Sequence, residues 1–213
     1  DYPSTYNFHE SRDYVDYTDD IYVGYRYFET IPGAAEKVVY PFGYGLSYTT
    51  FDVESVSAGV VNSNCTSEAN KLYAKVRVTN TGKFSGKEVV QVYIAKPQGK
   101  LGKPAKELAA FEKTRDLQPG ESQLMILTWE INDMASYDDL GKVKKSAYVL
   151  EAGSYDIYVG TSVRDVTKAD YSYILNHDVI TEQLSAKLVP TSLPKRLLAD
   201  GSYEALPQSE PVD

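Results

Sequence analysis

The sequence has 213 residues, a formal net charge of −8, 42% hydrophobic residues and one cysteine. Readers of nucleic acid usually carry a basic patch, so the acidic balance argues against a nucleic-acid partner. No apolar run reaches the length of a membrane span, so no membrane contact is expected. Cys65 alone allows neither an internal disulfide nor a cysteine-based zinc site. The compartment stays open, and with no visible signal peptide we favour the cytoplasm over secretion.

The first 39 residues are polar and rich in turns. Four aspartates are interleaved with tyrosines: Asp13, Asp16, Asp19 and Asp20. Such spacing is compatible with calcium, but the central glycine and terminal glutamate of an EF-hand loop are missing. We therefore expect a solvated acidic loop, followed by a β-prone run with alternating aromatics from Ile21 to Glu29.

The character of the sequence changes between Tyr40 and Phe51. Gly43 and Gly45 flank Tyr44 there, and glycine permits positive φ and close backbone approach. The stretch is expected to be a shaped turn that joins the end of one domain to the start of an all-β domain. Three aromatic side chains are expected to pack the two domains together: Phe42, Tyr44 and Tyr48.

From Phe51 onward the sequence alternates between apolar and polar residues. Leu72, Ala74, Val76 and Val78 lie on one face of a predicted strand, which Asn80-Thr81-Gly82 ends. Further strands are predicted over residues 89–95, 123–129, 148–151, 155–159 and 171–175, with a tight turn at Pro119-Gly120. Beyond Asp178 the alternation fades, and Ile180–Leu188 is expected to form one or two amphipathic turns.

Two of these predicted strands are apolar on both faces. In residues 89–95, Val90 and Val92 oppose Val89 and Tyr93, and in residues 123–129, Leu124 and Ile126 oppose Met125, Leu127 and Trp129. Large exposed apolar patches usually mark contacts. We therefore expect one sheet to be covered from outside by a second domain or a partner.

The predicted fold class is mainly β. Seven or so short strands separated by turn signals indicate an immunoglobulin or fibronectin type III-like β-sandwich, with an irregular N-terminal segment and an extended C-terminal tail. Tyr155 stands where a tyrosine corner would place its hydroxyl against the backbone. The cysteine and tryptophan pattern of antibody domains is absent, so the fibronectin-like variant fits better.

Residue types alone offer little catalytic chemistry. The sequence lacks a nucleophile elbow, a P-loop, a dinucleotide fingerprint and a metal-ligand set, so no cofactor and no metal are expected. His9 and His177 are expected at the surface, and Ser47 lacks the second glycine of a nucleophile elbow. Glycoside hydrolysis requires two carboxylates, for which Asp20 and Glu29 are weak candidates. The 19 tyrosines suit strands and interfaces, and alternatively sugar-binding surfaces.

Two groups of residues carry a closer resemblance. Asp20–Phe28 followed by Tyr40–Phe51 resembles the end of the second, α/β domain of glycoside hydrolase family 3 enzymes, which are β-glucosidases and related exo-acting glycosidases. The sandwich is similar to their fibronectin type III-like domain. The matching stretches are residues 78–82, 86–93, 104–108, Phe111, residues 117–121 and 153–155.

The resemblance implies a retaining parent enzyme with an aspartate nucleophile and a second residue acting as acid and then base. In the family the nucleophile lies on the (β/α)₈ barrel, and the acid/base precedes the motif at residues 40–51. Neither position has a counterpart here, so we assign no catalytic residue and expect this chain alone to be inactive. Tyr25 and Tyr44 are weak candidates for substrate contact.

The expected division is a remnant of the α/β domain over residues 1–50, the sandwich over residues 51–178 and a connector over residues 179–213. Residues 196–203 resemble the connector of a family branch with reversed domain order. On this interpretation both ends are cut surfaces, and the partners are the remaining α/β domain, the barrel and the parent's glycoside substrate. The alternative is a stand-alone carbohydrate-binding or adhesive sandwich.

Overall fold

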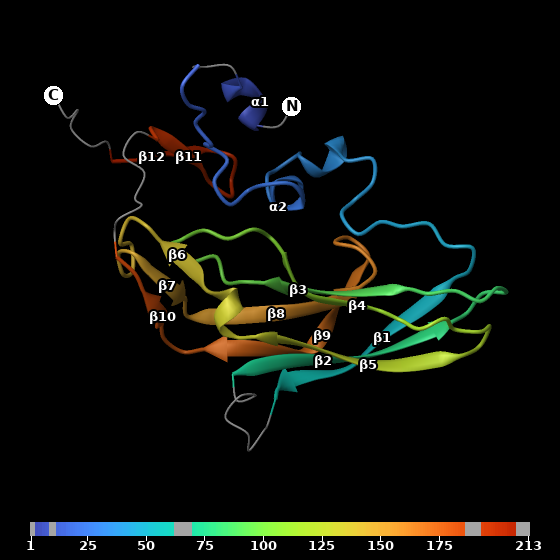
Figure 1. Cartoon of the computed structure of the whole chain (residues 1–213). Helices are drawn as coiled ribbons and strands as arrows, with labels where there is room; N and C mark the ends of the chain where they lie inside the picture. Colours follow the sequence, from blue (N-terminus) through green and yellow to red (C-terminus); the bar gives the residue numbers. More distant parts are fainter. Residues whose placement is uncertain (1–2, 9–11, 62–69, 186–192, 208–213) are drawn as a thin grey trace.

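Two antiparallel sheets packed face to face form most of the molecule (Figure 1). The computed structural model describes residues 3–8, 12–61, 70–185 and 193–207, and within these the chain is mainly β. One sheet has the order β1-β2-β5 and the other β4-β3-β8-β9. The bounds are β1 (Phe51–Val60), β2 (Lys71–Asn80), β3 (Val89–Ala95), β4 (Glu107–Lys113), β5 (Ser122–Glu130), β8 (Gly153–Gly160) and β9 (Val166–Leu175). The predicted β-sandwich is confirmed.

The core lies between these sheets and follows the predicted alternation. On β2 the inward residues Leu72, Ala74, Val76 and Val78 are fully buried, as are Tyr155 and Ile157 of β8. Burying one such aliphatic side chain contributes roughly 1.5–3 kcal/mol relative to exposing it. The tyrosine corner is also present, because the Tyr155 hydroxyl donates a hydrogen bond to the Glu151 carbonyl at 2.9 Å.

A smaller sheet closes one end of the sandwich. Its order is β10-β7-β6, with β6 (Ser136–Asp138), β7 (Ala147–Leu150) and β10 (Val179–Gln183), and the 3₁₀ turn η2 (Asn132–Met134) precedes it. The prediction of an amphipathic turn from Ile180 is wrong as far as Gln183, because the backbone there pairs with β7. Residues 186–188 of that prediction lie outside the described residues.

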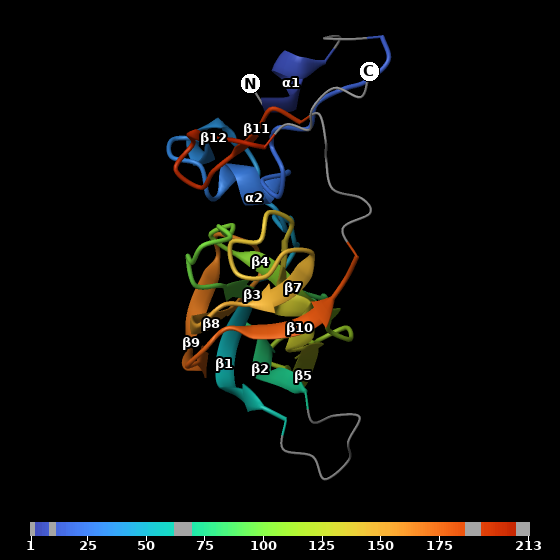
Figure 2. The ribbon, with the colours of Figure 1, turned by 90° about the vertical axis from the view of Figure 1, so that its left-hand side faces the viewer.

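Above the sandwich sits a second, smaller unit that we call the head, formed by residues 12–49 and 193–207 (Figures 1 and 2). It contains α2 (Tyr25–Phe28), the 3₁₀ turn η1 (Ala35–Lys37) and the hairpin of β11 (Lys195–Leu197) and β12 (Tyr203–Ala205). The short helix α1 (Pro3–Asn7) lies beside it. The head has a core of its own, formed by Tyr22, Tyr27, Ala34 and Leu197.

The β-structure predicted for Ile21–Glu29 is wrong, because Ile21–Gly24 are irregular and Tyr25–Phe28 form a helical turn. Gly24 adopts a φ of 56°, and the chain then closes hydrogen bonds from Phe28 N to Gly24 O (3.2 Å) and from Glu29 N to Tyr25 O (2.8 Å). β-propensity depends on the presence of neighbouring strands. No strand pairs with this segment among the described residues, so local hydrogen bonds satisfy its backbone.

Asn80 fastens the end of β2 to the loops around it. Its fully buried amide nitrogen donates to the carbonyls of Phe84 and Leu117, both at 2.8 Å. Its amide oxygen accepts hydrogen bonds from the Thr49 hydroxyl (2.7 Å) and the Gly82 amide (3.0 Å). One side chain therefore ties together the chain entering β1 and two turns of the sandwich.

We expect Asn80→Ala to lower the free energy of unfolding by about 2 kcal/mol, because the buried partners of the amide lose their hydrogen bonds without gaining water. Urea denaturation followed by tryptophan fluorescence measures the loss. Asn132→Ala is the matched control, since Asn132 is exposed. A loss at Asn80 no larger than at Asn132 would contradict this role.

Candidate functional site

The outer face of β3 is the place where the head meets the sandwich. The Tyr25 ring stacks on Phe42 with centroids 4.4 Å apart and meets the edge of Tyr93 at 6.2 Å. The Tyr25 hydroxyl accepts a hydrogen bond from the Leu108 amide at 2.9 Å. Burial raises the pKa of Tyr25, and it raises that of Tyr93 more strongly. These rings form an apolar seam between head and sandwich.

Gln91 of β3 extends this seam with polar contacts. Its amide nitrogen donates to the Thr161 carbonyl at 2.7 Å and to the Gly43 carbonyl at 3.5 Å, and its oxygen accepts the Tyr93 hydroxyl. Gly43 has a φ of 85°, and a Cβ there would collide with the Gln91 amide. The glycine-aromatic motif therefore does form a shaped turn, and Gly43 permits its close approach to β3.

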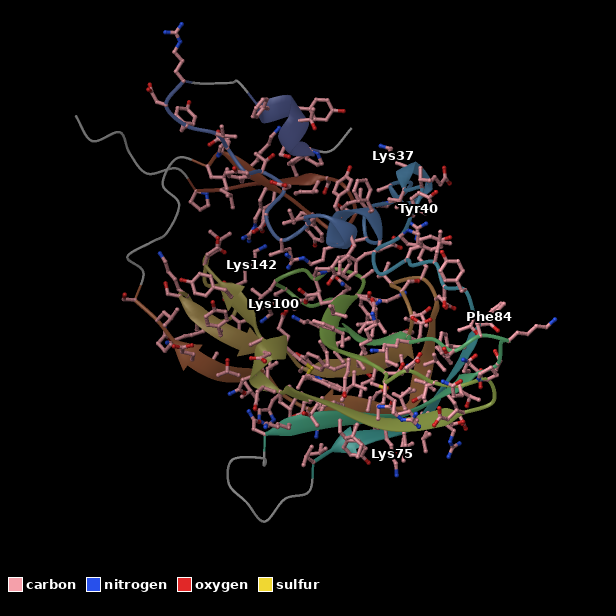
Figure 3. The ribbon with its side chains drawn as sticks, turned by 45° about the vertical axis from the view of Figure 1, so that its right-hand side comes forward. Lys37, Tyr40, Lys75, Phe84, Lys100 and Lys142 are labelled. Atoms are coloured by element: carbon pink, nitrogen blue, oxygen red, sulfur yellow. The ribbon has the colours of Figure 1, made fainter. Side chains whose placement is uncertain are left out.

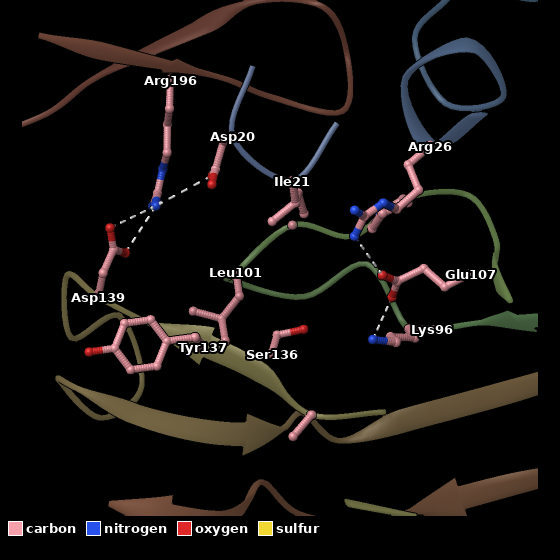
Figure 4. Close-up of a pocket in the computed structure, with 13 residues that line it drawn as sticks. Asp20, Ile21, Arg26, Lys96, Leu101, Glu107, Ser136, Tyr137, Asp139 and Arg196 are labelled. Atoms are coloured by element: carbon pink, nitrogen blue, oxygen red, sulfur yellow. Dashed lines mark hydrogen bonds and ion pairs between the residues drawn. The ribbon is translucent and has the colours of Figure 1, made fainter. Parts of the chain in front are cut away.

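A charged cavity of about 440 Å³ separates the head from the sandwich at the other end of the seam (Figure 4). Head residues supply one wall, and the loops beside β6 and between β3 and β4 supply the other. Arg26 pairs with Glu107 at 3.4 Å, and Lys96 pairs with the other oxygen of Glu107 at 2.5 Å. One sandwich carboxylate thus holds one cation from each unit.

Arg196 of β11 is the second polar junction in this cavity. It contacts Asp139 at 2.9 Å, Glu204 at 3.1 Å and Asp20 at 3.8 Å. Burial lowers the pKa of Arg196, but Asp139 and the other carboxylates raise it by more, so the net shift is upward. For Asp20, burial raises the pKa, Arg196 lowers it, and the net shift is again upward. The cavity is lined by paired charges, an arrangement typical of a docked interface.

Arg164, from the loop between β8 and β9, forms a third junction. Its guanidinium pairs with Glu29 at 2.7 Å and donates to the Ala35 carbonyl at 3.0 Å. Nearby, the Lys106 ammonium donates to the Val163 carbonyl at 2.8 Å. The loop carrying Arg164 is therefore fastened to the head on one side and to the sandwich on the other.

The structure gives the two weak carboxylate candidates different surroundings. Asp20 lines the charged cavity beside Arg196, whereas Glu29 pairs with Arg164 and lines a separate hollow of about 230 Å³. A glycosidase needs its two carboxyl groups across one scissile bond. Asp20 and Glu29 do not share a cavity, so the geometry offers them no joint catalytic role.

The two tyrosine candidates also lie differently. Tyr25 is held within the seam, while Tyr44 is 49% exposed and its ring lies 5.1 Å from that of Tyr40. Of the three aromatics expected to pack the units together, Phe42 stacks on Tyr25 within the head. Its contact with the sandwich is through the backbone, because the Phe42 carbonyl accepts a hydrogen bond from the Val163 amide at 2.9 Å. The prediction for Tyr48 is wrong within this chain, because its side chain is 96% exposed. A sugar contact from Tyr25 or Tyr44 stays a prediction.

The structure supports no catalytic role for the other candidate residues of the sequence analysis. Ser47 is exposed and accepts a hydrogen bond from the Thr49 amide at 3.3 Å, and His177 is exposed as predicted. His9 and Cys65 lie outside the described residues. Within the part of the chain that the structure describes, no group of acidic, histidine or cysteine side chains is arranged to hold a metal. No helix there is long and apolar enough to cross a membrane.

Comparisons with known proteins agree with this architecture. Residues 88–163 match the model of the "Fibronectin type III-like domain" family. The whole chain is 62% identical to 27% of the length of Beta-glucosidase A from Butyrivibrio fibrisolvens. A β-glucosidase structure from Paenibacillus barengoltzii matches 98% of the chain with a TM-score of 0.83 and 45% identity, over 23% of that protein. A Bifidobacterium adolescentis GH3 β-glucosidase matches 81% of it at 34% identity and a TM-score of 0.67, also over 23%.

The chain corresponds to the fibronectin type III-like region of glycoside hydrolase family 3 proteins. It spans about a quarter of the length of the relatives it matches. The relatives are thus larger proteins with further domains. Both the head and the sandwich fall within the matched region, since the alignments extend over 98% or more of the chain.

Sequence reasoning missed the residues that fasten this family 3 region together. Gln91 sits on a predicted strand, and its partners Gly43 and Thr161 are far away in the sequence. Arg164 and Arg196 look like ordinary surface cations when read in order. One signal was available: a buried-face glutamine within an apolar strand requires hydrogen-bond partners from another segment.

Proposed function

We propose that this chain is the non-catalytic, structural portion of a family 3 β-glycosidase and that it braces the catalytic domains. The parent would be an exo-acting, β-glucosidase-like hydrolase of O-glycosyl bonds, with the rest of the α/β domain and a (β/α)₈ barrel as partners of this chain. The observation that carries the proposal is the seam, in which Tyr25, Phe42 and Tyr93 interlock head and sandwich.

The second support for bracing is the strap, which we define as residues 38–48. It is the part of the head that leads into the sandwich, and it carries large exposed apolar side chains, as Figure 3 illustrates for Tyr40. Val39 is 82% exposed and Leu46 90% exposed. An apolar patch of this kind is unusual on a surface that faces solvent and is typical of a surface that another domain covers. In the proposed parent, the remainder of the α/β domain covers the strap.

We propose that the parent is divided as follows. Residues 1–50 would belong to the α/β domain, residues 51–178 to the sandwich and residues 179–213 would lead to the barrel in the reversed domain order, except that β10 (Val179–Gln183) pairs with β7 and so extends the sandwich to Gln183. The hairpin β11–β12 supports a role for the last segment beyond linking, because the Leu197 amide donates to the Thr18 carbonyl at 2.7 Å. The connector thereby also completes the head.

A chimera tests bracing directly. We would replace the aligned region of the Butyrivibrio Beta-glucosidase A by this chain and follow nitrophenol release from an aryl β-glucoside. The chimera is expected to be active, and the 213-residue chain alone inactive. In the chimera, Tyr25→Ala should weaken the seam by about 2 kcal/mol, because packing and a hydrogen bond are lost. Heat inactivation should then occur at a lower temperature.

Steady-state kinetics separate bracing from a sugar contact. A bracing residue leaves KM unchanged before heating, whereas loss of a substrate contact raises KM. Arg115→Ala is the matched control, since Arg115 forms an exposed ion pair with Glu121 away from the seam. Hydrolysis by the isolated chain, or a Tyr25→Ala chimera with unchanged heat stability, would overturn the proposal.

The exposed tyrosines of the strap favour one rival function, a stand-alone carbohydrate-binding module. Tyr40 is 68% exposed and Tyr44 49%, but their rings are tilted by 31° and do not form one flat platform. Affinity electrophoresis of the 213-residue chain against cellulose, xylan and β-glucan distinguishes the two functions. Clear retardation by any of these polysaccharides would favour the rival.

A further inference from the structure

The charged cavity between the head and the sandwich has the size and position of a small-molecule site. Its volume of about 440 Å³ falls within the range of about 300–1,000 Å³ that is usual for ligand pockets, and such pockets are frequent where two units meet. Figure 4 shows the charged clusters around Arg196 and Glu107 at opposite ends of the cavity. A ligand bound there would contact both the head and the sandwich.

The charged side chains that line the cavity sum to zero and are already paired. The set consists of three cations and three carboxylates: Arg26, Lys96, Arg196, Asp20, Glu107 and Asp139. Each of them lies within 3.8 Å of an opposite charge. A charged ligand would have to displace one of these partners, and separating a partly buried ion pair costs free energy. The cavity therefore favours a neutral ligand.

The cavity also has hydrogen-bonding capacity that these ion pairs do not use. Among the described residues, the hydroxyl groups of Ser136 and Tyr137 make no hydrogen bond. Arg196 donates through Nε and Nη1, and Arg26 through Nη1, whereas each guanidinium group has five N–H donors. A neutral ligand with several hydroxyl groups can donate to the carboxylates and accept from the guanidinium groups without separating either from its partner.

Tyr137 adds an aromatic surface to this polar lining. It is 41% exposed, and the ring of Tyr148 lies against its ring with centroids 5.3 Å apart. Leu101 and Ile21 supply aliphatic surface to the same cavity. A sugar ring combines C–H faces, which pack on aromatic and aliphatic carbon, with hydroxyl groups at its edge, which form hydrogen bonds. The lining of the cavity matches both properties.

We propose that the charged cavity binds a small neutral saccharide of one or two sugar rings. The ring of Tyr137 packs against a C–H face of the sugar, and the sugar hydroxyls bond to the unused donors and acceptors of the clusters around Arg196 and Glu107. This site goes beyond the bracing role, because the chain can brace its parent without binding sugar. It also differs from a polysaccharide platform on the strap, because the cavity lies between two walls and takes a short saccharide.

Isothermal titration calorimetry of the 213-residue chain with glucose and with cellobiose tests the proposal. A dissociation constant of about 1 mM is expected for at least one of the two, because a hydrated site gives a small ligand limited affinity. Tyr137→Leu should raise this constant about fivefold and Ser136→Ala about threefold, since they remove the ring and a hydroxyl group. Tyr203→Leu is the matched control, because Tyr203 is 43% exposed and does not line the cavity.

Thermal unfolding gives an independent measurement. The sugar at about ten times its dissociation constant should raise the Tm of the wild type by about 3–5 °C, because it binds only the folded chain. Without sugar, each variant should unfold within about 2 °C of the wild type, since neither Ser136 nor Tyr137 loses a side-chain hydrogen bond to a described residue. Glycine and inorganic phosphate serve as charged probes. Failure of both sugars to bind, undiminished binding by Tyr137→Leu and Ser136→Ala, or tighter binding of a charged probe would each overturn the proposal.

Discussion

Glu151→Ala is expected to destabilise the chain by about 4 kcal/mol, because it leaves the buried ammonium group of Lys103 without its charge partner. Lys103 and Glu151 form an ion pair whose side chains are 1% and 4% exposed. Burial lowers the pKa of Lys103, and the hydrogen bond and charge of Glu151 oppose that shift. Glu151 also accepts the amides of Lys100 (2.6 Å) and Leu101 (3.3 Å). Its loss releases the loop that lines the charged cavity.

Thermal unfolding measures this effect, and a loss of that size corresponds to a fall in Tm of roughly 10 °C for a chain of this length. Replacing both partners, with Lys103→Met and Glu151→Leu, should recover much of the loss, because no charge remains buried. Glu130→Ala is the control, since its pair with Lys71 is at the surface and contributes under about 1 kcal/mol. Equal losses for Glu151→Ala and Glu130→Ala would show that the buried pair is not essential.

Asp138→Asn is expected to cost about 3 kcal/mol at neutral pH, because one carboxylate organises a whole loop. Asp138 is 1% exposed. Its two oxygens accept four backbone amides at 2.7–3.0 Å, those of residues 141–144. An asparagine has one acceptor oxygen and an NH₂ group that would oppose two of these donors. The loop between β6 and β7 therefore loses two of the four hydrogen bonds that its backbone donates to residue 138.

The pH dependence of stability provides a second test of the role of Asp138. Burial raises the pKa of Asp138, but the four backbone hydrogen bonds lower it by more, and the net value lies below the usual 3.8. The charged form is thus favoured by folding. Its contribution is fully present above about pH 5, begins to fall near the unfolded value of about 4 and is lost as the pH falls through the lowered native pKa.

The difference in unfolding free energy between wild type and Asp138→Asn should therefore be constant above about pH 5 and shrink below pH 4. Urea denaturation across this range measures it. Asp133→Asn, at an exposed neighbouring position, should match wild type throughout. A wild-type advantage that persists unchanged into acid would show that the carboxylate charge is not responsible.

The sandwich was predictable from the sequence because its signals are local. On β2, alternation alone identified four fully buried residues, and the turn at Pro119-Gly120 forms with Gly120 at a φ of 80°. The tyrosine corner followed from a short stretch around Tyr155. Period-2 burial and turn chemistry need no knowledge of distant segments.

The head and the seam were not predictable because their causes are remote in the sequence. The aromatic run at Tyr25–Phe28 has strand composition, yet it folds as a helical turn, because among the described residues no strand pairs with it. Arg164 gains its role only when Glu29, far earlier in the chain, is brought next to it. The sequence showed that β5 is apolar on both faces but did not show which face points outward: Leu124 and Ile126 are exposed, whereas Met125 is buried.

The core of the head has a consequence for the order of synthesis. Tyr22 and Tyr27 emerge from the ribosome before the sandwich, but Leu197, which completes their cluster, is made only after the entire sandwich. Domains generally fold as units during translation, so the sandwich is complete while the head still lacks a side of its core. Until the hairpin β11–β12 arrives, the nascent head exposes tyrosines to other chains and to chaperones. A ribosome pause before Leu193 would prolong that vulnerable interval.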